Sequence, residues 1–367
     1  MSAGSPAVAA AAAVLRVVPV VPPLDAEAIP AGVRREALAA LADLTEAAAY
    51  LGDPDLFHRP RFRTMVHRHR IGSADPVRLT ERIATAAEDR AAAGLLAVHS
   101  VRAELRERPG RRPCFTPDSL AELHGLLTAA DPNIPGRGGF RRSAATVTWA
   151  DGRRFAIDVP PGKALRGHVE RWFRWGTRTT SPPLDAAAFS MVRLVTIHPF
   201  PDANGRTARL LAQCDLVAAG LLPGLLLDLE GWVHGHRYEH DEAVVAASEG
   251  RWTEWGALFA RAVTETARHR IAAIATHRRL LDATIARVGG DPAAAAVLTH
   301  FRAGPAVSAA WLRERMSHDE MPDGRMPDDP EPALARLLDA GILTAHPRLP
   351  GALIHPELLA VLDAPFE

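Results

Sequence analysis

Residues 197–209 read IHPFPDANGRTAR. Pro, Asp, Asn and Gly in this run predict a tight turn after a helix, and the apolar periodicity from Thr207 onward predicts a second helix. The first turn of a helix presents free backbone N–H groups and the positive end of the helix dipole, which together bind anions. The run therefore predicts an anion site between two helices.

Four polar side chains in this run suit a phosphate-containing substrate. Arg206 and Arg209 are three residues apart, so both can project from the first helical turn toward one anion. Asp202 is a hard oxygen ligand, suited to Mg²⁺ that bridges phosphate oxygens. His198 ends the incoming helix and can accept a proton from a hydroxyl group at neutral pH. Together they predict phosphoryl or nucleotidyl transfer, in which positioning and charge neutralisation do most of the catalytic work.

Each of these features also has an ordinary structural interpretation. A lone histidine after a helix is usually a cap or a packing residue, Asp-Ala-Asn-Gly is a common turn, and two arginines can lie on a solvated helix face. All of them occur within residues 198–209, in an order that makes geometric sense. This coincidence favours the functional interpretation.

The composition indicates a globular protein. The 367 residues are 47% hydrophobic, with 43 Lys+Arg against 43 Asp+Glu, and this length allows two or three domains. Lys163 is the only lysine, so the arginine content reflects a G+C-rich codon usage and says nothing about nucleic acid. Cys114 and Cys214 fit neither a disulfide framework nor a metal site, which favours a reducing compartment. We expect a cytoplasmic protein.

The N-terminal stretch from Ala7 to Val21 is apolar, but no Lys or Arg precedes it and Arg16 interrupts it. A helical or frayed terminus therefore fits better than a signal peptide. No other segment approaches the roughly 20 apolar residues that a membrane span requires, so we expect no membrane insertion.

Most of the chain is predicted to be helical, because apolar residues recur every three or four positions in windows rich in Ala, Leu, Arg and Glu. Helices are expected over residues 34–52, 77–106, 117–129, 165–174, 184–197, 206–219, 235–249 and 252–288. One stretch differs. Thr146–Trp149 and Arg153–Val159 are β-prone runs joined through Asp151-Gly152, which predicts a β-hairpin that has to lean on the helices.

The last 80 or so residues predict a small winged-helix-like domain, with short helices at 292–302, 308–316 and 332–343 before an extended piece at 347–354. The third helix offers only Arg336 as a cation, and acidic residues flank it. DNA affinity depends largely on cations that neutralise phosphates, so this face disfavours nucleic acid. An interaction or dimerisation role fits better, and a homodimer is a candidate assembly.

Residues 198–209 resemble the signature motif of the Fic family. The hairpin resembles the family's target-binding flap, the helix before the motif is also similar, and so are Pro135-Gly136 and Phe140-Arg141. The expected fold is mainly α: a Fic-like helical core with a β-hairpin flap and a C-terminal winged-helix-like domain. The expected domains are an N-terminal helical segment (1–78), the core (79–285) and the C-terminal domain (286–367).

The resemblance implies transfer of AMP from ATP to a Ser, Thr or Tyr hydroxyl of a protein, with release of pyrophosphate, and this protein itself is one candidate target. His198 would deprotonate the target hydroxyl, and Asp202 would hold Mg²⁺. The nucleotide and its phosphates would contact Asn204, Gly205, Arg206, Arg209 and Tyr238. The flap, residues 146–159, would align the target by strand addition, chiefly through Thr146, Val147, Thr148 and Trp149.

Gly205 distinguishes two subclasses, because Doc-like kinases of the same superfamily have Lys there and transfer the γ-phosphate instead. Gly205 therefore favours nucleotidyl transfer. Three alternatives stay open: another diphosphate donor such as UTP or CDP-choline, removal of AMP, and a winged-helix DNA-binding regulator with an inactive site. Trp232 could stack on a base, although a core position is the simpler interpretation, as it is for Met191.

Many Fic proteins carry an inhibitory helix, and residues 79–106 are the candidate segment, with Glu88 as the inhibitory residue. The match is degraded, because Ala84 replaces the usual Ser or Thr and Asp89 replaces Gly or Asn. A carboxylate bonded to Arg209 would compete with the γ-phosphate. Glu88 could equally be an exposed helix residue.

Overall fold

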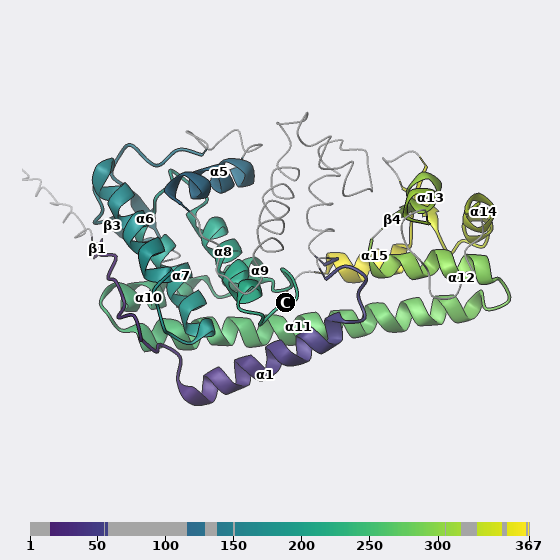
Figure 1. The fold of residues 1–367 in the computed structure, drawn as a ribbon, viewed down its shortest axis with the longest axis horizontal. Helices are drawn as coiled ribbons and strands as arrows, with labels where there is room; N and C mark the ends of the chain where they lie inside the picture. Colours follow the sequence, from purple (N-terminus) through teal and green to yellow (C-terminus); the bar gives the residue numbers. More distant parts are fainter. Residues whose placement is uncertain are drawn as a thin grey trace, which may run out of the picture.

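The structure is a computed structural model that describes residues 15–54, 56–57, 116–128, 138–149, 151–304, 306–316, 329–346, 351–364 and 366. It is mainly α-helical. Helix α11 (Trp252–Arg287) forms a spine, with most of the other helices at one end and a small C-terminal unit at the other (Figure 1). Helices α1 (Ala31–Ala48) and α15 (Pro356–Asp363) pack along this spine. The sequence predicted α11 and α1 but not α15.

Helix α7 (Pro183–Ile197) lies at the centre of the larger unit and is buried along nearly its whole length. Its run of Ala, Leu, Phe, Met and Val is apolar on every side, as expected of a helix surrounded by protein. Helix α8 (Asn204–Ala218) packs against it, and α6 (Lys163–Gly176) covers another side. Met191 is only 3% exposed and fills the core, as the sequence predicted.

Residues 235–249 form parts of two helices where the sequence predicted one. Helix α9 (Leu229–Gly235) begins earlier, because the Asp228 side chain accepts the Gly231 N–H at 3.0 Å as an N-cap. The backbone leaves the helical region at His236, and α10 (Arg237–Ser248) follows. The prediction took Gly235 as the start of a helix, whereas this glycine ends α9, so the helix before it was missed.

The predicted hairpin is confirmed. Strands β2 (Thr146–Thr148) and β3 (Arg154–Ile157) are antiparallel, and Gly152 takes the positive φ, 84°, that the turn requires. A third strand, β1 (Leu15–Val17), pairs in parallel with β3, so the sheet order is β1-β3-β2. The expectation of a helical or frayed terminus is therefore wrong for these three residues, because they pair with the edge of β3 and bury Val17 in the core.

A buried carboxylate ties the N-terminal segment to the core. Asp185, at the start of α7, is fully buried and accepts the backbone N–H groups of Ala28 and Ile29, each at 2.8 Å. It also accepts the guanidinium of Arg34 at 2.9 Å. The backbone of Ala28 passes so close to Gly256 of α11 that a Cβ there would lie 2.5 Å from it. Gly256 is therefore required for this approach.

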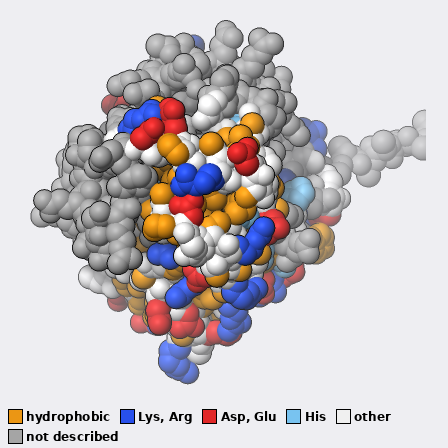
Figure 2. Space-filling model, turned by 90° about the vertical axis from the view of Figure 1, so that its right-hand side faces the viewer, with side chains coloured by type: hydrophobic (Ala, Val, Ile, Leu, Met, Phe, Trp, Pro, Cys, Tyr) orange, Lys and Arg blue, Asp and Glu red, His pale blue; other side chains and the backbone are white. Residues whose placement is uncertain are grey.

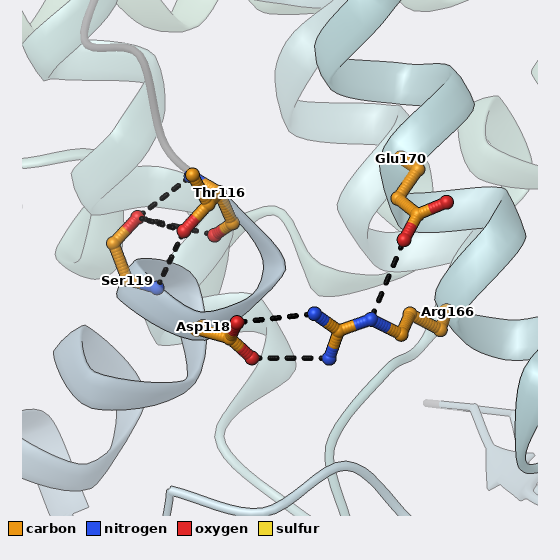
Figure 3. Close-up of polar contacts among 5 residues, drawn as sticks. All are labelled: Thr116, Asp118, Ser119, Arg166 and Glu170. Atoms are coloured by element: carbon orange, nitrogen blue, oxygen red, sulfur yellow. Dashed lines mark hydrogen bonds and ion pairs between the residues drawn. The ribbon is translucent and has the colours of Figure 1, made fainter.

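Helix α5 (Pro117–Thr128) begins with a reciprocal cap, in which Thr116 and Ser119 each accept the other's backbone N–H (Figure 3). Asp118 in its first turn accepts two hydrogen bonds from Arg166 of α6, at 3.0 and 3.1 Å. These exposed contacts fix the direction of α5 more than they stabilise it.

The C-terminal unit has its own apolar core. Its elements follow the order α12 (Pro292–Thr299), a 3₁₀ turn η1 (His300–Arg302), β4 (Ala306–Ser308), α13 (Ala309–Met316), α14 (Glu331–Asp339), β5 (Thr344–Ala345) and β6 (Ala352–Ile354). The strand order is β4-β6-β5. Leu281 of α11 belongs to this core, so α11 crosses the domain boundary expected at residues 285–286.

The surface at this end of the molecule mixes an apolar patch with acidic and basic side chains (Figure 2). Two of its arginines are paired with carboxylates: Arg336 with Asp291, and Arg313 with Asp329 and Glu331. Across the described ranges, no helix is both long and apolar enough to cross a membrane.

Candidate active site

A cavity of about 220 Å³ lies where α7, α8, α9, α10 and the three-stranded sheet meet. His198, at the end of α7, and Gly205 and Arg209, in the first turns of α8, line one part of it. The wall from the sheet is apolar and contains Val147, Trp149 and Ile157, and the wall from α9 and α10 contains Glu230, Val233, His234, Arg237, His240, Asp241 and Val244. The side of the cavity formed by α8, α9 and α10 thus carries charged side chains, and the side formed by the sheet is apolar.

The turn between α7 and α8 is held in an unusual backbone conformation. His198 and Ala203 both have positive φ, 50° and 58°, which costs a non-glycine residue about 1–2 kcal/mol. The Asn204 side chain holds the turn closed, because its Oδ1 accepts the Phe200 N–H and its Nδ2 donates to the Phe200 carbonyl, both at 2.9 Å. The Asn204 side chain is thus engaged in holding the turn, which leaves its backbone N–H at the start of α8.

His198 is held in the tautomer that a general base requires. Its Nδ1 lies 3.3 Å from the carbonyl oxygen of Val195, which can only accept, so Nδ1 carries the hydrogen and Nε2 has the free lone pair. Burial lowers the pKa of His198 to about 4. The imidazole is therefore neutral at pH 7 and able to accept a proton.

Arg141 supports the turn between α7 and α8, residues 198–203, which is the proposed catalytic turn, and does not itself line the cavity. This side chain is 3% exposed, and its guanidinium donates to the carbonyl oxygens of His198 (2.8 Å), Ser143 (2.8 Å) and Val159 (2.5 Å). Its backbone N–H donates to Pro199 at 2.9 Å. Burial lowers the pKa of Arg141. The contacts join the catalytic turn to the residues on both sides of the hairpin.

Arg209 is bonded to a carboxylate that the sequence analysis did not single out. Its Nε and Nη2 lie 2.7 and 2.5 Å from one oxygen of Glu230, in the first turn of α9. A Cβ at Gly205 would lie 3.0 Å from the Arg209 guanidinium, so the glycine leaves room for this side chain. One of the two arginines of the predicted phosphate site is thus paired with Glu230.

Asp202 is exposed and lies two residues before α8, and its Oδ1 accepts the Ala203 N–H at 2.5 Å. Within the described ranges, no group of three or more His, Cys, Asp or Glu side chains is placed to hold a metal ion. Mg²⁺ commonly binds through one or two carboxylates together with substrate phosphates and water. A single accessible carboxylate beside an anion-binding turn fits that pattern.

The other predicted site residues lie in different surroundings. Arg206 is half-buried in the first turn of α8 and is not among the residues that line the cavity. Tyr238 is 59% exposed and does not line it either, whereas Arg237 and Asp241 of the same helix do. Its contact with a nucleotide stays a prediction. Glu88, together with the rest of the candidate inhibitory helix 79–106, lies outside the described residues.

On the hairpin, the predicted target-binding residues separate into two groups. Thr146 and Thr148 are exposed on β2, which is an edge strand of the sheet. Trp149 is 6% exposed and stacks on Phe155 with ring centroids 3.8 Å apart. Trp149 therefore supports the hairpin and lines the cavity, while the outer edge of β2 has no strand beside it among the described residues.

Part of the chain is similar to known proteins. Residues 114–215, which include α5, the hairpin, α7 and the catalytic turn, match the model of the Fic/DOC family. The chain contains a Fic domain. Protein adenylyltransferase Fic of Aedes aegypti is 34% identical over 141 residues, 37% of this chain and 25% of that protein. Its counterpart in Drosophila melanogaster is 37% identical over 117 residues, 30% of this chain and 22% of that protein.

The chain therefore spans about a quarter of the length of these curated relatives. Among solved structures, a Fic family protein from Desulfovibrio desulfuricans aligns with a TM-score of 0.45 and 16% identity, over 87% of this chain and 95% of that chain. A Fic-1 fragment from C. elegans aligns with a TM-score of 0.43 and 19% identity, over 67% and 74%.

Two contacts around the cavity and the turn before α8 escaped the sequence analysis. Glu230 lies 21 residues beyond Arg209, between the helices predicted at 206–219 and 235–249. Arg141 was noted through the family resemblance alone, and its contact with His198 spans 57 residues. No local sequence signal identifies either residue, because each contact forms only when segments far apart in the chain pack together.

Proposed function

We propose that this protein is a protein adenylyltransferase, which transfers AMP from ATP to a hydroxyl side chain of a protein and releases pyrophosphate. The observation that carries the proposal is the arrangement of His198, Gly205 and Arg209 around one cavity, with the free Nε2 of a neutral histidine beside the start of a helix. The name shared by the curated relatives supports the same activity.

In this reaction, the hydroxyl oxygen of the target forms a bond to the α-phosphorus of ATP as the bond from that phosphorus to the bridging oxygen of pyrophosphate breaks. His198 Nε2 accepts the hydroxyl proton. The backbone N–H groups at the start of α8 stabilise the negative charge on the phosphate oxygens. Arg209 binds the terminal phosphate once it exchanges Glu230 for that anion.

Mg²⁺ is the metal that this chemistry requires, and Asp202 is the residue that would hold it, together with the phosphates. Bound Mg²⁺ would neutralise phosphate charge. The exposed edge of β2 would align the target, because main-chain hydrogen bonds along a strand accept many side-chain sequences.

The remaining proposals concern the whole chain. We assign a winged-helix-like fold to the C-terminal unit, supported by its order of helix, strand, two helices and two strands. We place the protein in the cytoplasm on its cysteine content, and we assign this unit to protein contacts such as a homodimer. A DNA-binding role gains no support, because Arg336 and Arg313 are paired with carboxylates.

The test is the intact mass of the purified protein after incubation with ATP and Mg²⁺, for the wild type and His198→Ala. A gain of about 329 Da per transferred AMP that disappears in His198→Ala is the expected result. Candidate target proteins are added in a parallel series, with UTP and CDP-choline as competing donors.

Increments of about 80 Da would show phosphate transfer and contradict the inference from Gly205. Equal gains in wild type and His198→Ala would remove His198 from the mechanism. Increments that match another donor would replace ATP.

A further inference from the structure

A second histidine, on α5, contacts the catalytic turn. His124, on α5, is fully buried, and its Nε2 lies 3.0 Å from the carbonyl oxygen of Asp202. Its ring stacks on that of Phe200 with centroids 3.8 Å apart and an interplanar angle of 4°. His124 thus touches two residues of the six that join α7 to α8.

The hydrogen bonds of His124 define its tautomer. The Gly138 N–H donates to Nδ1 at 3.3 Å, so Nδ1 is the acceptor. The carbonyl of Asp202 can only accept, so Nε2 carries the hydrogen and donates it. One neutral ring therefore satisfies two backbone groups, one before the hairpin and one in the catalytic turn.

The helix that carries His124 is built to hold a fixed position. It is capped at Thr116 and Ser119 and bonded through Asp118 to Arg166 of α6 (Figure 3). Gly125, next to His124, allows the backbone of Gly138 to approach, since a Cβ at Gly125 would lie 3.3 Å from the Gly138 Cα. The close approach places the Gly138 N–H within reach of the ring.

We infer that His124 is a positioning residue for the phosphate site: its Nε2–H holds the Asp202 carbonyl and so places both the Asp202 side chain and the start of α8. This inference rests on the proposed function for its catalytic consequence. The two residues of the turn with positive φ, His198 and Ala203, flank the segment that His124 holds. Such a backbone needs outside contacts to keep one conformation.

Three variants separate the hydrogen bond from the ring stack. His124→Gln places an amide N–H near the position of Nε2, His124→Asn places its amide near Nδ1, and His124→Phe keeps the stack on Phe200 but removes both hydrogen bonds. Each variant is measured for kcat and KM with ATP, for thermal midpoint, and for hydrogen exchange of the backbone amides of residues 200–206.

We expect His124→Gln to keep most of kcat, whereas His124→Asn and His124→Phe lose on the order of 10- to 100-fold, because a displaced turn misplaces the reacting groups. Amide exchange in residues 200–206 rises in the Asn and Phe variants and stays near the wild-type rate in the Gln variant. Loss of kcat that follows the thermal midpoint alone, with no advantage for Gln, would reduce His124 to a structural role.

Hydrogen exchange keeps the two proposals distinguishable. If the wild type transfers no AMP, the proposed function fails, while the order of exchange among the three variants still tests His124. Unchanged exchange in all three variants overturns the inference even if the enzyme is an adenylyltransferase.

Discussion

Arg209 donates a hydrogen bond from Nε to one oxygen of Glu230, and its Nη2 forms an ion pair with the same oxygen; this pair lies in the cavity where a terminal phosphate would bind. Glu230 is 58% exposed while Arg209 is 12% exposed, so water screens the pair from one side and the interaction contributes on the order of 1 kcal/mol. Glu230 therefore competes with the nucleotide only modestly. The sequence analysis expected such a competitor at Glu88, and that expectation stays a prediction.

Substitution of Glu230 by Gln removes the competing charge while keeping the side-chain length. We expect the KM for ATP to fall about two- to fivefold, in line with an exposed ion pair. Glu239→Gln is the matched control, because Glu239 also forms an exposed pair, with Arg261, but does not line the cavity. A higher KM in Glu230→Gln would show that Glu230 positions Arg209 for the phosphate.

At the scale of the elements, the site depends on how the hairpin and the catalytic turn are joined. Arg141 is the connection, because its guanidinium reaches His198 in the turn and Val159 just after β3. A second contact is the ion pair between Arg153, at the hairpin tip, and Glu242 of α10. The hairpin that would receive the target is thus anchored to the base that would deprotonate it.

Arg141→Lys keeps the charge but cannot reproduce the three bonds of the planar guanidinium. We expect a loss of about 2–4 kcal/mol in the free energy of unfolding, because buried carbonyl groups lose charged hydrogen-bond donors. Urea unfolding measures this loss, and kcat of the folded fraction reports the position of His198. The control is Arg142→Lys, whose side chain is exposed. Equal stability of the two variants would contradict the bracing role.

At the scale of the whole molecule, α11 joins the catalytic unit to the C-terminal unit, and the N-terminal segment bridges both (Figure 1). The Gly52 N–H donates to the Arg302 carbonyl at 3.0 Å. Tyr50 lies between the guanidinium groups of Arg278 and Arg302, at 5.5 and 4.9 Å from its ring centroid. His277 of α11 is buried beneath this junction, in edge contact with Tyr50.

The buried His277 predicts that the junction weakens in acid. Neither of its ring nitrogens has a hydrogen-bond partner among the described residues, and burial, with the nearby His355 and Arg302, lowers its pKa to about 4. The unfolded chain binds the proton near pH 6.5, so the stability present above that pH is lost as the pH falls toward 4.

For His277 alone, this loss amounts to at most about 2 kcal/mol between pH 7 and pH 5. Thermal melting at the two pH values measures it, with His277→Phe as the comparison. The Phe variant keeps a ring against Tyr50 without a titrating group, so its melting temperature should fall less. An equal decrease in both proteins would assign the acid sensitivity to other groups.

The sequence by itself determined which residues the proposed site draws on, because His198, Asp202, Gly205, Arg206 and Arg209 all lie within residues 198–209, where local turn and helix rules predict how they are presented. It also determined the hairpin and the helices at α1, α5, α6, α7, α8 and α11, where periodicity and the Asp151-Gly152 turn act over short distances.

Only the tertiary structure decided which groups surround that motif. His124 reaches Asp202 across 78 residues, Arg141 reaches His198 across 57, and β1, at residues 15–17, pairs with β3, at residues 154–157. Glu230 meets Arg209 through the packing of α9 against α8. No local pattern predicts such contacts, because they depend on which surfaces of the folded chain come within hydrogen-bonding distance of one another.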